Sequence, residues 1–367
     1  MRILSPVGLL SDKLNPTVQA QFDKSIRRIR YSRFLRCWLL PYLRSRIRGG
    51  FRPILGCVYT DLKCNLDCPY CRSHDNSIPG MDEDTGRRVI DWLHSTGCRV
   101  IGLMGGEPLV RLAFVEQFVR YAAGKGCYLY LPTNGRLLTP DVTDRLADAG
   151  VATFNVALDC IHEKPGLPKA LDRIRANFDY LVRLQSRYAY TVFLSINITR
   201  FNLEDVKLLT EFSRENGIGT AYHLCESSPG HAAFPSEELG PVDKLLDHLI
   251  ERNRAGYSMV NSTEHLRAMK SLLRGGVAPW PCRGGQNMVI CRTDGTLAPC
   301  YPMRESERDW GSAGCEKFDT CQLADLKQTC SGSCFSTVGY MLANFYDVRR
   351  VAREVRAQAV RRLGSAR

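Results

Sequence analysis

The sequence has no long run of apolar residues. None of its hydrophobic stretches approaches the ~20 residues that a helix needs to span a bilayer. The opening residues, MRILSPVGLL, form too short an apolar stretch for a signal peptide, and no small-residue cleavage site follows. Internal repeats and low-complexity tracts are also lacking. We therefore expect a cytoplasmic, globular protein with one large domain or two unequal ones.

Cysteine, by contrast, is abundant, with 16 among 367 residues. A disulfide framework is not expected in a chain without an export signal, because the cytoplasm keeps thiols reduced. Metal binding or redox chemistry is the better interpretation of so many cysteines.

Positive charge is concentrated at the two ends of the chain. The net charge is +12, of which residues 1–52 contribute +10 and residues 345–367 contribute +5, so the body carries −3. In residues 25–50, arginines alternate with aromatic and aliphatic residues, and Pro41 is expected to break this segment into two cationic amphipathic helices. Such helices suit an anionic membrane surface. Packing on the protein, or binding of an acidic substrate, would explain the composition as well. No nucleic-acid-binding module is visible, so nucleic acid is not an expected partner.

Short apolar stretches alternate with longer amphipathic ones along the middle of the chain. Strands are predicted at 54–61, 99–105, 127–133, 151–159, 191–199 and 219–226, and helices at 83–96, 111–124, 140–149, 168–187, 203–216 and 241–255. This alternation indicates parallel strands with right-handed crossovers. Six units are too few for a closed eight-stranded barrel. The predicted fold class is therefore α/β, a partial (β/α)6 TIM-type barrel with its site at the carboxyl ends of the strands.

Four regions follow from this pattern. They are a basic amphipathic helical segment (1–52), the barrel core (53–256), a linker helix with a small cysteine-rich extension (257–337), and a basic C-terminal helix (338–367). The cysteine-rich part is rich in Gly, Pro and Asp and has little periodicity. We expect cysteine-bound metal, rather than a hydrophobic core, to hold it together.

Three closely spaced cysteines come directly after the first predicted strand. Cys64, Cys68 and Cys71 form C-x3-C-x2-C within TDLKCNLDCPYC. Thiolates at this spacing can converge on one face of an iron–sulfur cube and leave one iron without a protein ligand. An open coordination position is typical of a catalytic metal. A zinc site that uses His74 as its fourth ligand explains the spacing equally well.

The residues around these cysteines resemble the radical S-adenosylmethionine (SAM) superfamily over about residues 53–230. The matching pieces, each at the end of a predicted strand, are the cysteine motif with Tyr70, Gly105-Gly106-Glu107-Pro108, Thr133-Asn134-Gly135, Leu158-Asp159, and Asn197 to Arg200. The cysteine motif and the GGEP motif in this order are far more specific than a lone motif.

This resemblance implies a [4Fe–4S] cluster on the three cysteines and SAM bound to its open iron. One electron from an external donor of the flavodoxin or ferredoxin type would then release a 5′-deoxyadenosyl radical. The implied SAM contacts are Tyr70 beside the adenine, the backbone of Gly105, Gly106, Glu107 and Pro108 at the amino group, Asn134, Asp159 and Asn197 at the ribose and carboxylate, and Arg200 at the carboxylate. A turn or a helix cap is an equally good role for each polar residue at a strand end.

A second group of cysteines lies near the C-terminus. Residues 282–300 (CRGGQNMVICRTDGTLAPC) predict a β-hairpin that turns at Asp294-Gly295, and CSGSC follows downstream. The region resembles the SPASM and twitch extensions of radical SAM enzymes, but it lacks the C-x2-C pair of the full SPASM form. It therefore favours the twitch form, with one auxiliary [4Fe–4S] cluster held by Cys282, Cys300, Cys330 and Cys334. Cys321 could replace one of the last two, and a zinc ribbon on the same thiols also fits.

Two further cysteines are candidate catalytic residues. Cys160 and Cys225 each end a predicted strand, so they are placed to face the site and to donate a hydrogen atom to a substrate radical. A half-buried thiol without a role is the alternative. Glu226, next to Cys225, is a candidate to orient the substrate or to take a proton, as is His223.

The predicted function is that of a radical SAM enzyme that abstracts a hydrogen atom from an unactivated C–H bond. Epimerisation, dehydrogenation or C–C bond formation could follow. A lipid or isoprenoid substrate is favoured over a peptide or a sugar-type precursor, and the basic ends favour a peripheral position at the inner face of the membrane. The alternative is a zinc-stabilised, non-catalytic binding or adaptor protein on a degenerate radical SAM scaffold.

Overall fold

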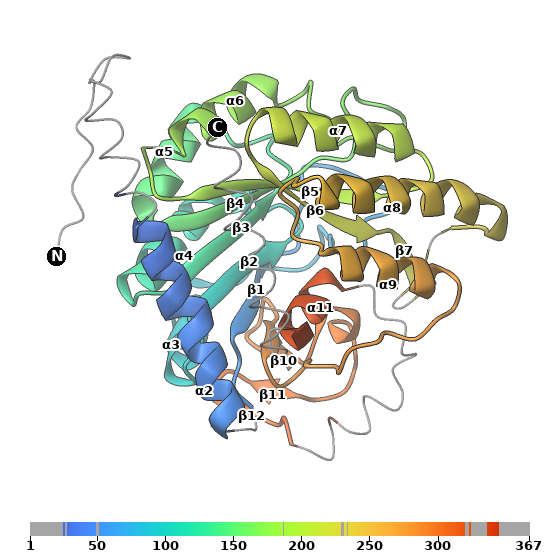
Figure 1. Ribbon diagram of the computed structural model, residues 1–367. Helices are drawn as coiled ribbons and strands as arrows, with labels where there is room; N and C mark the ends of the chain where they lie inside the picture. The colour runs from blue at the N-terminus through green and yellow to red at the C-terminus, as the bar shows by residue number, and fades with distance from the viewer. Residues whose placement is uncertain are drawn as a thin grey trace.

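An open, largely parallel sheet positions the site in the computed structural model, which describes residues 25, 28–48, 51–185, 187–228, 231–232, 234–319, 323 and 336–344 (Figure 1). Six of its strands pair in parallel and in chain order. They are β1 (Leu55–Asp61), β2 (Val100–Gly105), β3 (Tyr128–Thr133), β4 (Val151–Ala157), β5 (Thr191–Ile198) and β6 (Gly219–Leu224). The six predicted strands and the open barrel are thus confirmed.

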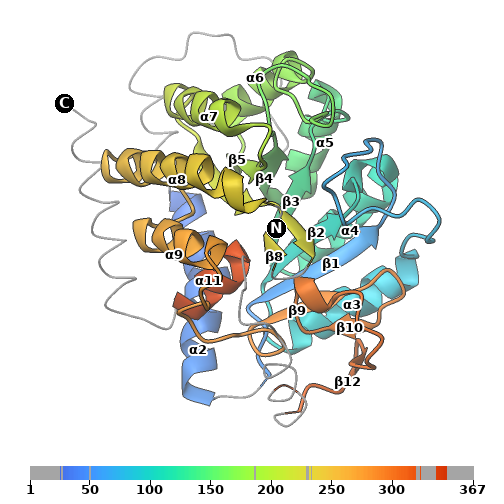
Figure 2. The ribbon, with the colours of Figure 1, turned by 90° about the vertical axis from the view of Figure 1, so that its right-hand side faces the viewer.

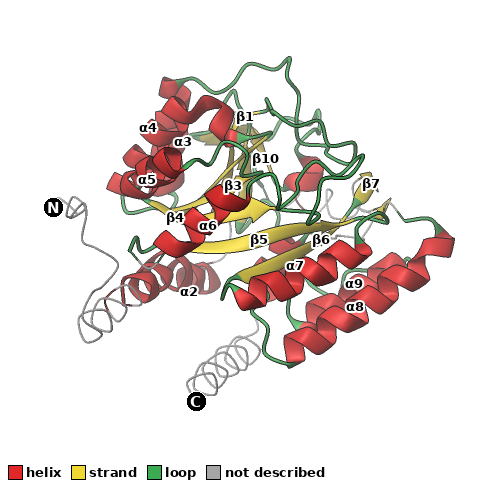
Figure 3. Cartoon of the chain, turned by 90° about the horizontal axis from the view of Figure 1, so that it is seen from above, coloured by secondary structure: helices red, strands yellow, loops and turns green. Residues whose placement is uncertain are grey.

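Helices that follow these strands in the chain cover the outer face of the sheet (Figures 1 and 3). They are α3 (Glu83–Ser95), α4 (Leu112–Gly124), α5 (Pro140–Ala149), α6 (Arg175–Leu184), α7 (Leu203–Glu215) and α8 (Leu239–Arg254). Their ends follow local rules. Asp82 caps α3 by accepting the N–H of Thr85 at 2.7 Å. Gly150, with φ of +115°, ends α5 in the left-handed conformation.

The predicted helix at 168–187 starts later than expected, at Arg175. Residues 160–174 form a loop instead, in which Cys160 makes a β-bridge with Ala170. Backbone pairing explains the difference: the N–H of Asp159 donates to the carbonyl of Lys169 at 2.8 Å, and the N–H of Leu171 donates to the carbonyl of Cys160 at 3.0 Å. This loop therefore returns to the carboxyl end of β4.

The C-terminal hairpin joins the main sheet. Its strands are β9 (Met288–Cys291) and β10 (Leu297–Ala298), which pair antiparallel as predicted. In addition, β9 pairs in parallel with β1, so β9 and β10 extend the sheet beyond β1. Val289 and Cys291 are buried in the main core. The expectation that this part has no core is therefore wrong, because the open barrel leaves an edge of β1 on which an apolar strand can pair.

Smaller elements complete the described part of the chain. They are β7 (Glu226–Ser228), β8 (His231–Ala232), α9 (Thr263–Leu273), β11 (Gly311–Ser312), β12 (Cys315–Glu316), α11 (Thr337–Asn344), and the short turns η2 (Pro108–Arg111), η3 (Ser236–Glu238) and η4 (Tyr301–Met303). Helix α9 packs beside α8, and α11 lies next to α9 (Figures 1 and 2). Only the start of the predicted basic helix at 338–363 is described; residues 345–367 lie outside the described residues.

The N-terminal segment is helical from residue 28 to residue 48, through a π-helical turn η1 (Leu35–Leu39) into α2 (Leu40–Arg48). The predicted break at Pro41 is therefore wrong. The N–H of Leu40 donates to the carbonyl of Leu35, a wider spacing than in an α-helix. We attribute the continuity to this wide turn, which shifts the carbonyls that the proline ring would otherwise meet.

This helix packs one face against the barrel. Cys37 and Tyr42 are buried, and the ring of Trp38 lies edge-on to Tyr128, with 6.3 Å between ring centroids. Its other sides expose Ile29, Tyr31, Phe34, Leu40 and Leu43. In the described part of the chain, no helix has the length and apolarity that crossing a membrane requires.

Candidate active site

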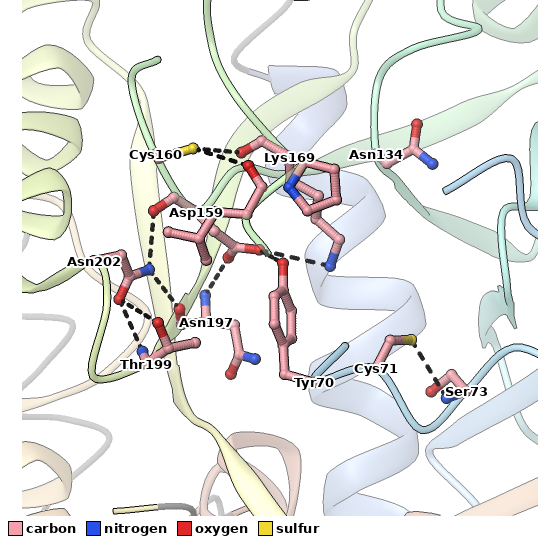
Figure 4. Close-up of polar contacts among 12 residues, drawn as sticks. Tyr70, Cys71, Ser73, Asn134, Asp159, Cys160, Lys169, Asn197, Thr199 and Asn202 are labelled. Atoms are coloured by element: carbon pink, nitrogen blue, oxygen red, sulfur yellow. Dashed lines mark hydrogen bonds and ion pairs between the residues drawn. The ribbon is translucent and has the colours of Figure 1, made fainter. Parts of the chain in front are cut away.

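The cysteine loop (62–80) follows β1 at the carboxyl edge of the sheet. Cys68 is buried, and Cys64 and Cys71 are half-buried. Backbone N–H groups donate to two of the sulfurs, each at 3.4 Å. Leu66 donates to Cys64 Sγ, and Ser73 donates to Cys71 Sγ (Figure 4). Burial raises the pKa of the Cys64 and Cys68 thiols, so a metal must displace their protons to bind. The N–H donors then favour the thiolate form.

The two glycines of the GGEP motif pack against this loop. A Cβ on Gly105, whose φ is +153°, would lie 1.9 Å from the carbonyl oxygen of Asp61. A Cβ on Gly106 would lie 2.3 Å from the carbonyl oxygen of Lys63. In return, the Gly106 N–H donates to Asp61 and the Glu107 N–H to Lys63, at 3.1 and 2.8 Å. The glycines therefore allow the end of β2 to hold the start of the cysteine loop.

Glu107 ties β2 to β3 beneath the loop. Its buried carboxylate accepts the hydroxyl of Thr133 at 2.8 Å and the N–H groups of Asn134 and Leu109 at 2.7 and 3.1 Å. Burial raises the pKa of Glu107, and these hydrogen bonds oppose that rise. Pro108, the last residue of the motif, is buried and opens η2.

Asn134 contacts the cysteine loop from the end of β3. Its Nδ2 donates to Asn65 Oδ1 at 2.8 Å and lies 4.0 Å from Cys64 Sγ. This residue therefore supports the loop that carries the cysteines.

A buried carboxylate, Asp159, organises the residues beyond β4 (Figure 4). It accepts the hydroxyl of Tyr70 and, at 2.8 Å, the N–H of Asn197. Lys169 Nζ lies 3.8 Å from the same carboxylate and 5.3 Å from the centroid of the Tyr70 ring. Tyr70 is thus fixed between the loop and the barrel.

Lys169 escaped the sequence predictions. It belongs to the loop after β4, in a segment that was predicted as the start of the helix at 168–187. Although burial disfavours the ammonium, Asp159 and the three cysteines of the loop raise the pKa of Lys169 above its ordinary value. The available clue was a cation beside Pro168 in the connection that follows the carboxyl end of a barrel strand.

The last two predicted SAM contacts lie in different surroundings. Asn197 is held by Asn202, whose Nδ2 donates to the carbonyls of Asn197 and Asp159, both at 2.9 Å. Arg200 stacks on Phe201, 4.4 Å from its ring centroid, and pairs with Glu238 at 3.5 Å. The structure therefore brings Asn197 to the Asp159 group but directs Arg200 toward α8.

A cavity of about 610 Å³ occupies the inside of the open barrel. Tyr70, Cys71 and Lys169 line it near the cysteine loop, and Trp38 lines it near the amino ends of the strands. Apolar and aromatic side chains from β1, β2, β3, β5, β9 and α11 make up most of the wall: Leu55, Tyr59, Val100, Met104, Tyr128, Tyr130, Phe193, Met288, Ile290, Val338, Met341 and Leu342. The cavity thus connects the cysteine loop with a deep, mainly apolar interior.

The candidate catalytic residues differ in their access to this cavity. Glu226 lines it, as does His223, whose Nδ1 lies 3.2 Å from the hydroxyl of Thr337. Burial lowers the pKa of His223 to about 4, so its imidazole is neutral at neutral pH. Cys160 and Cys225 are buried outside the lining. The catalytic roles of Cys160, Cys225 and Glu226 stay predictions.

The Cys160 thiol makes a hydrogen bond within the loop in which it lies. It donates to the carbonyl of Leu167 at 3.3 Å (Figure 4). Burial raises its pKa to about 12.

Two of the four predicted auxiliary ligands are described. A Cβ on Gly284 would lie 3.1 Å from Cys300 Cβ and 3.6 Å from Cys282 Sγ, so both cysteines flank this glycine. Cys282 is exposed and Cys300 half-buried. Cys330, Cys334 and the alternative ligand Cys321 lie outside the described residues.

The turn after Cys300 contacts the first cysteine loop. The hydroxyls of Tyr301 and Ser73 are 3.0 Å apart. Arg304 donates to the carbonyls of Arg72 and Ser73 at 2.8 and 3.3 Å. The two cysteine regions are therefore physically joined.

A single metal ion and an iron–sulfur cluster place different demands on these residues. Among the described residues, no three His, Cys, Asp or Glu side chains converge closely enough to hold one ion. His74, the fourth ligand of the zinc alternative, contacts Asp67 at 3.5 Å. In a [4Fe–4S] cluster each cysteine binds a different iron, so the sulfurs need not converge on one point. Partly buried thiols with N–H donors fit such a cluster.

Comparison with known proteins agrees with this site. Residues 61–212 match the family model of the radical SAM superfamily. The chain is 31% identical over 314 residues to an AdoMet-dependent heme synthase of Methanosarcina barkeri, covering 73% of this chain and 87% of that protein. It is 27% identical over 270 residues to an AdoMet-dependent heme synthase of Nitratidesulfovibrio vulgaris, covering 65% and 70%.

A solved structure supports the fold. SuiB of Streptococcus suis bound to the precursor peptide SuiA superposes with a TM-score of 0.57 at 16% identity, covering 88% of this chain and 72% of SuiB. Together with the sequence relatives, the cysteine loop and the open barrel lead to one conclusion. The chain belongs to the radical SAM superfamily and is an enzyme of that family, with a [4Fe–4S] cluster and SAM as its cofactors.

Proposed function

We propose that Cys64, Cys68 and Cys71 hold the [4Fe–4S] cluster and that a substrate C–H bond is attacked in the barrel cavity. The bound cluster, reduced by an external one-electron donor of the flavodoxin or ferredoxin type, supplies the electron that cleaves SAM to a 5′-deoxyadenosyl radical. The proposal rests on one observation above all: Cys71, Tyr70 and Lys169 line the same cavity as the apolar barrel wall.

The neighbouring residues would position SAM. Asp159 fixes the Tyr70 ring through its hydroxyl, which leaves the ring edge and the face away from Lys169 for the adenine. Lys169 is better placed than Arg200 for the SAM carboxylate, because Lys169 faces the cavity and Arg200 faces Glu238. The backbone of Gly105 to Pro108 would receive the amino group.

A largely apolar substrate suits the cavity. Its wall is dominated by aliphatic and aromatic side chains, which favours an isoprenoid or another lipid over a sugar. A tetrapyrrole is the second candidate, because the relative with 31% identity is named a heme synthase. The family leaves the outcome open between epimerisation, dehydrogenation and C–C bond formation.

A second cluster would lie close to the substrate. We propose that Cys282, Cys300, Cys330 and Cys334 bind an auxiliary [4Fe–4S] cluster that exchanges an electron with the substrate. The support is the position of Cys300, directly before a turn that lines the cavity. The adaptor alternative explains neither the cavity beside the cysteine loop nor the enzymatic relatives.

The N-terminal helix would bring the enzyme to a membrane surface. Its exposed apolar side chains lie among arginines of residues 28–44, which suits an anionic lipid interface. Sedimentation with vesicles containing phosphatidylglycerol tests this. Leu40→Ser and Leu43→Ser together should weaken that binding, whereas vesicles of phosphatidylcholine alone should bind neither protein.

Anaerobic reconstitution tests the central proposal. We expect about eight irons per chain, since each [4Fe–4S] cluster holds four, and 5′-deoxyadenosine when SAM and dithionite are added. Alanine at Cys64, Cys68 or Cys71 should remove about four irons and all SAM cleavage. Cys127→Ala is the matched control, because Cys127 is buried at the other end of the barrel. A Cys64→Ala protein that still made 5′-deoxyadenosine would contradict the proposal.

A further inference from the structure

The inside of the barrel is unusually open below the cysteine loop. Inward-facing residues form layers, and one layer contains Tyr59 and Met104 on β1 and β2, and Pro132 and Asn155 on β3 and β4, as the register of the strands shows. In the layer nearer the amino ends, Gly102 contributes no side chain. The cavity therefore continues past this layer instead of ending above it.

Two polar atoms in this layer have no hydrogen-bond partner in the described part of the chain. They are the hydroxyl of Tyr59 and Oδ1 of Asn155, both on side chains that are at least 95% buried and that line the cavity. The amide nitrogen of Asn155 already donates to the hydroxyl of Tyr130. Leaving buried polar atoms unpaired is unfavourable, so such a pair in a cavity wall points to a ligand that completes it.

Neighbouring polar groups in the wall are paired within the protein. The hydroxyl of Thr153, one layer below, bonds to Thr191 at 2.9 Å. Three cations line the cavity, of which Lys169 pairs with Asp159. Arg304 pairs with Glu305, and Arg72 is exposed to solvent. Burying a charged group of the ligand beside Tyr59 and Asn155 is therefore costly.

We propose that Tyr59 and Asn155 are the polar contacts of the substrate, which is an uncharged and mainly apolar molecule bearing a hydroxyl or an amide. A ligand hydroxyl can donate to Asn155 Oδ1, and the Tyr59 hydroxyl can donate to an oxygen of the ligand. The same ligand hydroxyl can accept a hydrogen bond instead, if the Asn155 amide is flipped so that its NH₂ group faces the cavity. The assignment rests on the proposed function, because the cavity is the one in which the C–H bond would be attacked.

Binding of small probes to the reconstituted full-length protein tests the assignment. The probes are n-octanol, its isomer heptyl methyl ether, which cannot donate a hydrogen bond, and octanoate, which is charged. Titration calorimetry should show n-octanol binding about tenfold more tightly than the ether, as one added buried hydrogen bond predicts. Octanoate should bind more weakly than n-octanol.

Three variants test which residues cause the preference for n-octanol over the ether. Asn155→Leu should bring the ratio between n-octanol and the ether close to one, and Tyr59→Phe should reduce it. Thr153→Val is the matched control, since its hydroxyl is already paired, and should keep the ratio. Equal binding of alcohol and ether by the unmodified protein, tighter binding of octanoate, no binding of either neutral probe, or an unchanged ratio in Asn155→Leu would overturn the assignment.

The same preparations separate this inference from the proposed function. 5′-Deoxyadenosine formed from SAM without substrate reports the cysteine loop alone, and the control variant Thr153→Val should retain it. Loss of this activity from the unmodified protein would remove the proposed function. A wrong probe preference with the activity intact would remove only the substrate assignment.

Discussion

The two cysteine regions are held by the fold to very different degrees. The first loop is fastened by the backbone of β2, by Glu107 and by Asn134, so its shape is set before any cluster binds. The second region places β9 in the core but leaves Cys282 exposed. The comparison indicates that the first cysteine loop is preorganised by packing, whereas the C-terminal region would depend more on the cluster proposed for it.

Substitution of one glycine in each cysteine region should give the largest difference in stability between the two regions. Gly106→Ala would place a Cβ 2.3 Å from a backbone oxygen, so we expect destabilisation by about 3 kcal/mol or more and loss of the first cluster. Gly284→Ala meets its nearest atom at 3.1 Å and should cost far less. Thermal melts and iron content check both. Equal losses would contradict the difference in preorganisation.

Glu107→Gln should be the next largest effect. The carboxylate accepts two backbone N–H groups, and an amide would turn a donor toward one of them. We expect a cost of about 2 kcal/mol and faster iron loss from the first site to a chelator. Glu116→Gln, on a surface carboxylate paired with Arg120 and Arg145, should cost less than about 1 kcal/mol. Similar rates of iron loss in the two variants would contradict the role of Glu107 in stabilising the first cysteine loop.

His223 makes the joint between barrel and C-terminal helix sensitive to acid. Its pKa is lowered to about 4, so the unfolded chain binds the proton more readily than the folded one. The contribution of neutral His223 to the free energy of unfolding should therefore be fully present above the unfolded pKa of about 6.5. It should fall as the pH drops toward 4, and the loss should reach about 2 kcal/mol at pH 5. Urea unfolding at pH 7 and pH 5 measures this. In His223→Gln the free energy of unfolding should fall less between pH 7 and pH 5. If it falls equally in the variant and the unmodified protein, His223 is not the source of the acid sensitivity.

Tyr301→Phe should produce the smallest effect. It removes the hydroxyl that joins η4 to Ser73, which is worth about 1 kcal/mol or less. SAM cleavage should persist, with at most a slight loss of stability in urea unfolding. A complete loss of cleavage would mean that the second region controls the first more tightly than their contacts suggest.

Sequence patterns predicted the barrel well because buried parallel strands and amphipathic helices leave regular signals. The cysteine and GGEP motifs gave the family for the same reason: they are local in sequence. Lys169 was missed because its segment was predicted as the start of a helix, whereas it forms a loop beside the end of β4. Pairing of β9 with β1 was missed because residues 288 and 55 are far apart in the chain. The predicted break at Pro41 failed because a wide helical turn accommodates the proline.

The predicted SAM contacts also show that a local pattern can place a residue at a strand end without fixing the direction of its side chain. Position at a strand end was enough to bring Asp159 and Asn197 together. It did not fix the direction of Arg200, whose side chain follows the nearby Glu238 and Phe201. The unpaired atoms of Tyr59 and Asn155 depend on packing across several strands and leave no trace in a linear pattern.

Helix α11 has a consequence for how this enzyme can be divided or recombined. Together with the residue before it, it lends the cavity Ser336, Thr337, Val338, Met341 and Leu342, and β9 and η4 add further wall residues. A barrel expressed alone to residue 256 would therefore lack part of the wall of the proposed substrate cavity. Exchange of the C-terminal extension between relatives should transfer substrate preference along with it, so the two parts of the chain have to diversify as a single unit.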